Sequence, residues 1–368
     1  MDHFHFWFLI IVFSYFLILF IFLYFSHKPD ILNNIIGFGA LFFVFIHILL
    51  FLLLMNQELL LQPFHVPLWL LLLGIPMIFP SVLILISTMV VVIYKKRTNK
   101  DPSEIGNKLV EKKKGWSKAK KDSLRKINHI FIFIGLFVVW YVGLFVVYLI
   151  TNSSVGMIPD ENNMLLQYLK LINIPDSMIE VLFSFGWFYY LLFFFFYLLC
   201  MCMLANEFTR KSKNISFPFN FFTILYLDEK EQDSYGSYLY FGIGQLFAAF
   251  ISPPMIFFAI LGISSISDLI TSQIGIRYGK KNISWNKKKT WEGTIAGTIV
   301  SFVICFFFIG IFWSIIFSLT FLVFDILTNK PLNVSDNLLI PIGCSLVYIF
   351  IRFFFNFEYY TILLSWIP

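Results

Sequence analysis

The sequence predicts an all-α fold, that of a polytopic integral membrane protein with about nine transmembrane helices. Of its 368 residues, 59% are hydrophobic and only 13% are charged, whereas about a quarter of the residues in an average soluble domain are charged. The mean hydropathy is +0.82. So few charges cannot cover the surface of a soluble protein. The long continuous apolar runs also argue against a transmembrane β-barrel, whose short strands alternate in polarity.

Apolar runs without charged residues account for the expected helices in chain order. A helix needs about 20 residues to cross the hydrocarbon core of a bilayer. Leu338–Ile351 is shorter and is expected to span as well. We expect the run Ser237–Ser267 to break into two shorter helices at Pro253-Pro254, because helices tend to end before a proline. The remaining runs are each long enough to span: Phe6–Phe25, Ile31–Leu54, Val66–Tyr94, Ile130–Ile150, Val181–Leu204 and Thr294–Phe324.

These runs divide the chain into four parts. We expect residues 1–95 to hold N-terminal transmembrane helices of unassigned role, and residues 96–128 to form a basic cytoplasmic loop. Residues 129–325 are expected to form the transmembrane region with the candidate site, and residues 326–368 to hold the C-terminal transmembrane segment or segments. The longest loops have about 30 residues, which is too few for a separate hydrophobic core.

Two basic loops predict the orientation of the chain. Lys95–Lys126 contains 13 Lys and Arg residues and four acidic residues, and Arg277–Lys289 contains six basic residues and no acid. Loops rich in Lys and Arg stay in the cytoplasm, so we expect both loops there and the N-terminus outside. This arrangement requires residues 237–276 to cross out and back. For most lysines of the first loop, attraction to anionic lipid is an equally good interpretation.

Polar residues gather where the run Ser237–Ser267 ends. Such residues are costly at membrane depth and therefore mark candidate functional sites. Asp268 closes the run, and Gly275 and Gly279 follow four residues apart. More polar residues and a third glycine complete the group: Arg277, Lys280, Lys288, Lys289, Thr290, Glu292 and Gly293.

This composition suits a polyphosphate bound together with a divalent cation. One or two carboxylates hold Mg²⁺ along with phosphate oxygens, cationic side chains neutralise the phosphates, and glycines let backbone N–H groups approach them. Taken alone, the pair Gly275 and Gly279 is more typical of a small-residue motif for helix packing. No Walker motif follows a predicted strand, which excludes a P-loop.

The segment Ser267–Thr294 resembles the signature of CTP-dependent membrane lipid kinases. The matching residues are Ser267-Asp268-x-x-x-Ser272-x-x-Gly275-x-Arg277-x-Gly279-Lys280, followed by Lys288-Lys289-Thr290-x-Glu292-Gly293-Thr294. These kinases comprise the dolichol kinase, phytol/farnesol kinase and yeast-type diacylglycerol kinase families, in one superfamily with phosphatidate cytidylyltransferase. Ser267 stands where most members have Gly. The ending Lys-Thr-x-Glu-Gly-Thr is most similar to dolichol kinase.

Two further segments resemble the kinase branch, so that the resemblance covers roughly residues 124–300. Arg125-Lys126-x-x-His129 is similar to an element of these kinases that the cytidylyltransferases generally lack. The polar segment from Glu207 to Gly244 is similar to the loop before the signature. The alternatives are two cations that extend to the membrane surface, an interfacial histidine, and a solvated loop over residues 228–231.

The resemblance implies a transferase that moves the γ-phosphoryl group of CTP to a lipid alcohol. It assigns catalysis to Asp268, Lys289, Glu292 and His129. Asp268 and Glu292 are the implied ligands of Mg²⁺ or another divalent cation, and His129 is the implied base for the alcohol. The nucleotide and its phosphates are assigned to the other residues of the two motifs: Arg125, Lys126, Gly275, Arg277, Gly279, Lys280, Lys288, Thr290 and Gly293.

We expect dolichol or another polyprenol as the acceptor and a site at the cytoplasmic face, in the endoplasmic reticulum membrane of a eukaryote or otherwise in the cell membrane. The expected partners are a membrane lipid and a nucleotide, with no nucleic acid, and a homodimer is a further hypothesis. Two other functions stay open. A phosphatidate (CTP:lipid-phosphate) cytidylyltransferase is disfavoured by the element at Arg125, and a transporter or scaffold by the lack of an inverted repeat.

Overall fold

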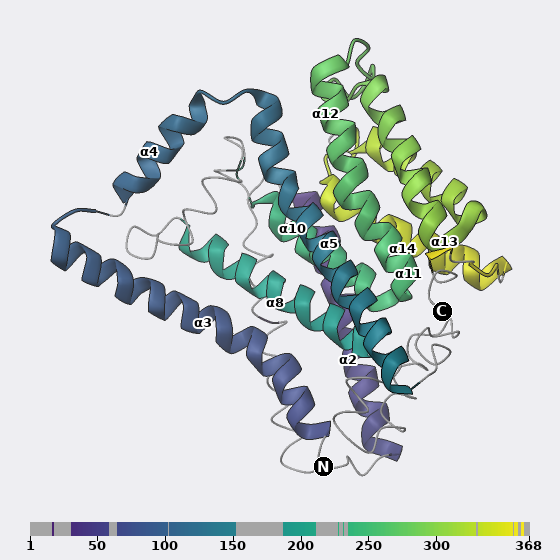
Figure 1. The fold of residues 1–368 in the computed structure, drawn as a ribbon, viewed down its shortest axis with the longest axis horizontal. Helices are drawn as coiled ribbons and strands as arrows, with labels where there is room; N and C mark the ends of the chain where they lie inside the picture. The colour runs from purple at the N-terminus through teal and green to yellow at the C-terminus, as the bar shows by residue number, and fades with distance from the viewer. Residues whose placement is uncertain are drawn as a thin grey trace.

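The computed structural model describes residues 31–58, 65–101, 103–151, 187–210, 235–328, 330–355, 357–359 and 362–363, together with residues 17, 227 and 231. Every named element in these ranges is a helix, which confirms the predicted all-α class (Figure 1). The predicted run Phe6–Phe25 lies outside the described residues except for Leu17. The first four elements are α2 (Ile31–Glu58), α3 (His65–Thr98), α4 (Ser103–Lys114) and α5 (Lys118–Thr151). The others are α8 (Trp187–Thr209), α10 (Ser237–Ile251), α11 (Pro254–Gly262), η3 (Ile263–Ser267), α12 (Asp268–Tyr278), α13 (Trp291–Leu327) and α14 (Asp336–Phe355).

Five helical segments of the described chain are long and apolar enough to cross a membrane: Ile78–Thr98, Lys118–Gly143, Pro254–Tyr278, Trp291–Leu327 and Asp336–Phe355. Shorter apolar helices lie at Ile31–Ile46, Phe195–Glu207 and Ser237–Ile251. The chain therefore has the helices of an integral membrane protein. The total of nine spans stays a prediction.

The predicted break at Pro253-Pro254 is confirmed. Helix α10 ends at Ile251, and α11 begins at Pro254, where proline is tolerated because the first helical residue needs no N–H partner. From there the chain continues without interruption through η3 and α12. The result is two helices of unequal length, since Pro254–Tyr278 has 25 residues and α10 has 15.

The run Thr294–Phe324 does not form the single span that the sequence predicts. Helix α13 contains a kink at Gly310, whose φ of 80° and ψ of 175° are not helical. A hydrogen bond shows that the chain folds back across this kink. The Thr294 hydroxyl donates to the Asp325 carboxylate over 2.6 Å, and the two residues are 31 positions apart in the sequence. In one straight helix they would be separated by about 46 Å. Both ends of α13 therefore lie at the same end of the molecule.

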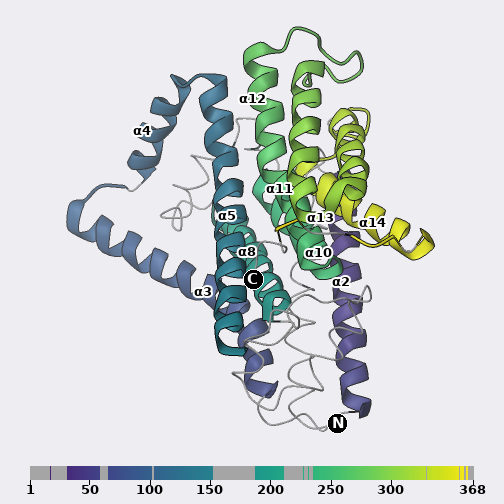
Figure 2. The same cartoon turned by 45° about the vertical axis from the view of Figure 1, so that its right-hand side comes forward.

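Helices α10 and α11 form the centre of the bundle (Figures 1 and 2). All nine residues of α11 are buried. Helix α10 packs against α8, α14 and α2, and α11 packs against α13, α14 and α5. By contrast, α3 packs against α8 at the edge of the bundle and exposes apolar side chains such as Ile78. Exposed apolar surface of this kind suits contact with lipid.

The segments around the two basic loops lie at one end of the molecule. In both views, α4, the beginning of α5, the end of α12 and the beginning of α13 are at the top. Helices α12 and α13 pack along each other, and α5 packs on the opposite side against α12 and η3. The residues of both sequence motifs therefore come from neighbouring helices.

Candidate functional site

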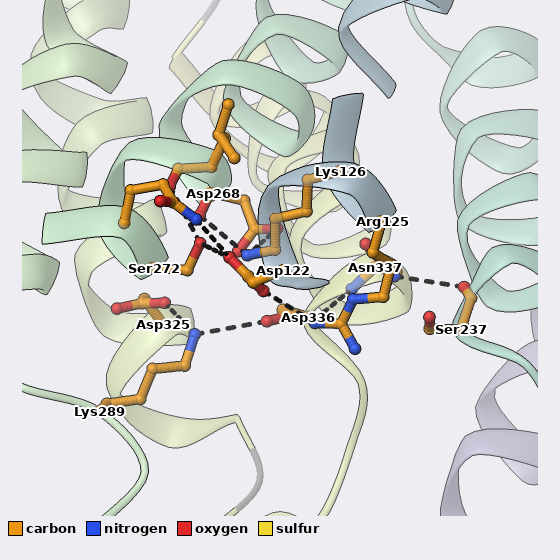
Figure 3. A network of polar contacts seen from close by, with 12 residues as sticks. Asp122, Arg125, Lys126, Ser237, Asp268, Ser272, Lys289, Asp325, Asp336 and Asn337 are labelled. Carbon is orange, nitrogen blue, oxygen red and sulfur yellow. Dashed lines mark hydrogen bonds and ion pairs between the residues drawn. The ribbon is translucent and has the colours of Figure 1, made fainter. Parts of the chain in front are cut away.

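A buried ion pair joins the two motifs that the sequence analysis identified. Lys126 Nζ of α5 lies 2.7 Å from Asp268 Oδ2 at the start of α12, and it donates a second bond of 2.9 Å to the Asp268 carbonyl. The two residues are 142 positions apart in the sequence. Only 5% of Lys126 and 3% of Asp268 is exposed. Figure 3 shows the pair at the centre of a larger network of charged side chains.

The π-helical segment η3 presents Asp268 to α5. The Asp268 N–H donates to the carbonyl of Ile263, five residues earlier, which is the bond pattern of a π-helix. This wider turn changes the faces on which the residues before and after it lie. Asp268 thus begins α12 with its carboxylate buried, and α5 supplies the cation that such a carboxylate needs.

A second layer of contacts lies one turn nearer the surface. Asp122 of α5 accepts hydrogen bonds from Ser272 Oγ at 2.5 Å and from Gln273 Nε2 at 3.1 Å. Arg125 lies 3.3 Å from Asp122 and 4.0 Å from a carboxylate oxygen of Glu231. Arg125 therefore faces a different set of partners from Lys126, although the two are adjacent in sequence.

Lys289 is held between two carboxylates of the C-terminal helices. Its Nζ lies 2.5 Å from Asp325 Oδ1 and 3.3 Å from Asp336 Oδ2. The other oxygen of Asp325 accepts the hydrogen bond from Thr294. Burial lowers the pKa of Lys289. The carboxylates of Asp325, Asp336 and Asp268 raise this pKa by more than burial lowers it, so the net shift is upward. Lys289 is therefore charged at neutral pH.

The loop before α13 has its own anchors. The N–H of Ile283 donates to the carbonyl of Lys289, and the Ile283 side chain is fully buried. The Asn286 side-chain amide donates to the carbonyls of Thr328 at 2.5 Å and Ile326 at 3.1 Å. These bonds tie the loop to the end of α13 and fix the position of Lys289.

The three glycines of the signature lie at the contact between α12 and α13. An added Cβ at Gly293 would come within 2.5 Å of the Thr271 carbonyl and 3.1 Å of Gly275. At Gly279 it would come within 2.6 Å of Thr290. Thr290 caps α13 by accepting a bond from the Gly293 N–H. This geometry is that of close helix packing, the alternative that the spacing alone favoured.

The remaining cations of the signature lie at the surface. Arg277, Lys280 and Lys288 have exposed side chains. Glu292 is also apart from Asp268, because its carboxylate accepts hydrogen bonds from the Lys281 N–H at 3.2 and 3.3 Å. Asp268 instead lies at the first residue of α12 and is paired with Lys126. The structure therefore does not bring the two predicted metal ligands to one point.

Of the two implied metal ligands, only Asp268 has a carboxylate oxygen that is available for a divalent cation. Its Oδ1 atom is buried and has no hydrogen-bond partner among the described residues, so one carboxylate oxygen is available. No group of three or more His, Cys, Asp or Glu side chains converges on a metal site in the described part of the chain. Mg²⁺ commonly binds through one or two carboxylates, phosphate oxygens and water.

His129 lies on α5 one turn below Lys126. Its imidazole stacks on the Phe241 ring of α10, with 3.8 Å between the ring centroids and 8° between the planes. The side chain is buried, and Nδ1 makes no hydrogen bond to any described residue. The structure thus places His129 against α10, one turn of α5 from the Lys126–Asp268 pair and in a more apolar position.

The polar segment before the signature forms a separate cluster. Glu207 binds Arg210 at 2.8 Å, accepts from the Gly236 N–H at 2.9 Å and is also bonded by the Tyr238 hydroxyl. Arg210 donates to the Glu231 carbonyl at 2.9 Å. These bonds connect the end of α8 to the start of α10. Residues 228–230 of the same segment lie outside the described residues.

Sequence reasoning missed three acids of the site, namely Asp122, Asp325 and Asp336. The sequence contains a feature that could have identified two of these acids. Asp325 follows the apolar run Thr294–Phe324 just as Asp268 follows its own run, and Asp336 lies two residues before Leu338–Ile351. Acids at the ends of apolar runs can meet when those ends lie on one side of the membrane. Their pairing with Lys289 became visible only with the fold-back at Gly310.

Comparison of the chain with protein-family models, with curated proteins and with solved structures gives no match. The geometry of the site and the resemblance of its motifs are therefore the basis for a functional assignment.

Proposed function

We propose that this protein is a CTP-dependent lipid alcohol kinase that phosphorylates dolichol or another polyprenol. The observation that supports this proposal best is the buried pair of Lys126 and Asp268. It joins the Arg-Lys-x-x-His element to the signature segment, two motifs that resemble the same kinases. A purely structural pair would gain little from such burial, because removing two charges from water costs about as much as their attraction returns.

Phosphoryl transfer depends mainly on positioning and on neutralising the charge of the transferred group. Asp268 would hold the divalent cation, which would supply positive charge beside the phosphate oxygens of the nucleotide. Lys126 orients the Asp268 carboxylate, and Arg125 and Lys289 contribute positive charge from either side of it. Asp325 and Asp336 keep Lys289 in place until a phosphate replaces one of them as its partner. His129 accepts the proton of the attacking alcohol.

Labelled nucleotides separate this function from its competitors. Purified protein is incubated with a polyprenol and with CTP labelled on either the γ- or the α-phosphorus. The kinase yields γ-label in an extractable lipid monophosphate, CDP as co-product, and no transfer once the divalent cation is chelated. A cytidylyltransferase given a lipid phosphate instead yields α-label on the lipid and releases pyrophosphate. No label in any lipid from a broad mixture contradicts both enzymes and favours a transporter or scaffold.

The proposed site faces the cytoplasm, and cysteine labelling tests this. Single cysteines replace Lys112, Lys281 and Lys330, all exposed, in a variant without the native cysteines. Each is expected to react with a membrane-impermeant reagent from the cytoplasmic side only. Lys330 is the sharpest position, because a straight α13 would place it on the opposite side. Labelling of Lys112 and Lys281 from different faces contradicts a one-sided site.

A further inference from the structure

Helices α5 and α12 run antiparallel with a fixed register. Lys126 of α5 is level with Asp268, and Asp122 is level with Ser272. A step of four residues towards the start of α5 therefore matches a step of four residues forward along α12. This regular pairing allows the next levels, deeper in the bundle, to be assigned.

The register continues into η3 and α11. The Phe133 ring lies against Gly262, where an added Cβ would meet it at 3.3 Å. On α5, His129 lies about midway between Lys126 and Phe133. On the facing helical segment, Ser265 of η3 lies midway between Asp268 and Gly262. The antiparallel register thus places His129 and Ser265 at one level, directly below the ion pair.

Both side chains at this level have an unused hydrogen-bonding atom. Ser265 is completely buried and His129 is 8% exposed. Within the described residues, neither Ser265 Oγ nor His129 Nδ1 has a hydrogen-bond partner. A buried polar atom without a partner costs about 1–3 kcal/mol, and native proteins contain few of them. Ser267 Oγ and Asp268 Oδ1 of the same segment also lack a described partner. What distinguishes His129 and Ser265 is that their unused atoms come from two facing helices at one level, next to a π-helical turn of the kind often found at functional sites.

The surroundings select a neutral ligand. The charges of Lys126 and Asp268 cancel each other immediately above, and the Phe241 ring covers the imidazole on one side. A lipid phosphate would bring negative charge to a level at which the facing stretches of α5, η3 and α10 carry no Lys or Arg. A hydroxyl group instead offers one donor and one acceptor, which match the two unused atoms.

We infer that His129 and Ser265 bind the terminal hydroxyl of a long-chain primary alcohol. The hydroxyl donates its hydrogen to His129 Nδ1 and accepts from Ser265 Oγ, while Asp268 Oδ1 stays available for the cation. This inference rests on the proposed function for the identity of the lipid. It adds Ser265 as a residue that distinguishes an alcohol from a lipid phosphate or an ether.

Binding without nucleotide tests this site. A tritiated C20 prenyl alcohol is bound to the purified full-length protein and displaced by the same unlabelled alcohol, its methyl ether or its monophosphate. We expect the ether and the monophosphate to compete at least about tenfold more weakly. Ser265→Ala is expected to weaken alcohol binding about tenfold. Its thermal unfolding midpoint should stay the same or rise, because the change removes an unpaired hydroxyl.

The neighbouring serine is a matched control. Ser264 is buried in the same π-helical segment, but its hydroxyl already donates to the Ile260 carbonyl at 2.9 Å. Ser264→Ala should leave alcohol binding unchanged. Equal effects of the two variants, or equal competition by alcohol and ether, overturn the inference. If the alcohol binds with the expected dependence on Ser265 but is never phosphorylated, the proposed function fails and the binding site stands. If the alcohol is phosphorylated but Ser265→Ala binds it as tightly as the natural protein does, the inference fails and the proposed function stands.

Discussion

The charged residues of the signature segment fall into two sets with very different surroundings, a buried half and an exposed half. The buried half comprises Asp268, which is paired with a lysine of another helix, and Lys289, which is held between two carboxylates. The exposed half comprises Arg277 and Lys280 at an exposed end, together with Glu292, whose carboxylate is bonded to the backbone of its own loop. Substitutions of charged residues within one motif, fewer than 30 positions apart, are therefore expected to lower the free energy of unfolding by different amounts. Breaking a buried pair costs about 3–5 kcal/mol, and an exposed pair about 0–1 kcal/mol.

The largest effect is expected at the buried half. Asp268→Asn should reduce phosphoryl transfer by about a thousandfold, on the order of 4 kcal/mol of transition-state stabilisation, because the proposed ligand of the cation is lost. It should also lower the thermal unfolding midpoint, since Lys126 remains buried without a counter-charge. Initial rates with γ-labelled CTP and thermal unfolding in detergent measure the two effects. Retention of more than a tenth of the activity excludes Asp268 as the ligand.

A double variant separates catalysis from folding. Lys126→Met with Asp268→Leu removes both charges and keeps apolar volume, which commonly restores the stability lost when one partner is removed. We expect the unfolding midpoint to return close to that of the natural protein while activity stays absent. Recovery of activity together with stability means that the pair is structural, and the contrast between the two halves then has no bearing on catalysis.

Lys289 and its neighbour Lys288 give the next largest contrast. Lys289→Met leaves Asp325 and Asp336 without their cation and should cost about 3 kcal/mol of unfolding free energy. Lys288→Met changes an exposed side chain and should leave the unfolding midpoint unchanged. Because the pKa of Lys289 is raised, its contribution is complete below the ordinary lysine pKa of 10.5 and is lost only at higher pH. Equal effects of the two substitutions contradict the buried assignment.

Gly310 controls whether Asp325 reaches Lys289 at all. Its φ of 80° and ψ of 175° are open to glycine and strained for other residues, so Gly310→Ala should cost about 1–3 kcal/mol. Gly39 of α2 is the matched control, because a Cβ there meets nothing within 4 Å. Gly39→Ala should be neutral or stabilising by up to about 1 kcal/mol. Thermal unfolding compares the two, and an unchanged midpoint for Gly310→Ala contradicts the fold-back.

The sequence predicted the elements whose cause is local. Apolar runs of sufficient length predicted the helices, and Pro254 predicted the break before α11 because it has no N–H to donate. The fold-back of α13 has no comparable local signal. A single long helix and a hairpin of two shorter ones have the same composition, and an isolated glycine such as Gly310 is tolerated within helices at a cost of about 1 kcal/mol.

The residues of the site divide in the same way. Asp268 was found because a carboxylate at the end of an apolar run has no structural use that the sequence explains. Its pairing with Lys126 depends on how α5 packs, and no spacing in the sequence encodes it. Glu292 was grouped with Asp268 because both belong to one motif, whereas in the structure Asp268 is paired with Lys126 and Glu292 is bonded to the backbone of Lys281.

The smallest effects are expected at the exposed half. Arg277→Ala and Lys280→Ala should each raise the KM for CTP about two- to fivefold and leave kcat unchanged, because exposed cations attract the nucleotide without contacting the transferred group. The difference from the natural protein should shrink as salt is raised, since the Debye length falls from about 10 Å at 0.1 M to 3 Å at 1 M. Lys100→Ala, in the exposed connection between α3 and α4, is the control and should change neither constant. Steady-state rates at the two salt concentrations test all three variants. A hundredfold loss of kcat at Arg277 or Lys280 would place the exposed half in the reacting centre and remove the distinction between the two halves.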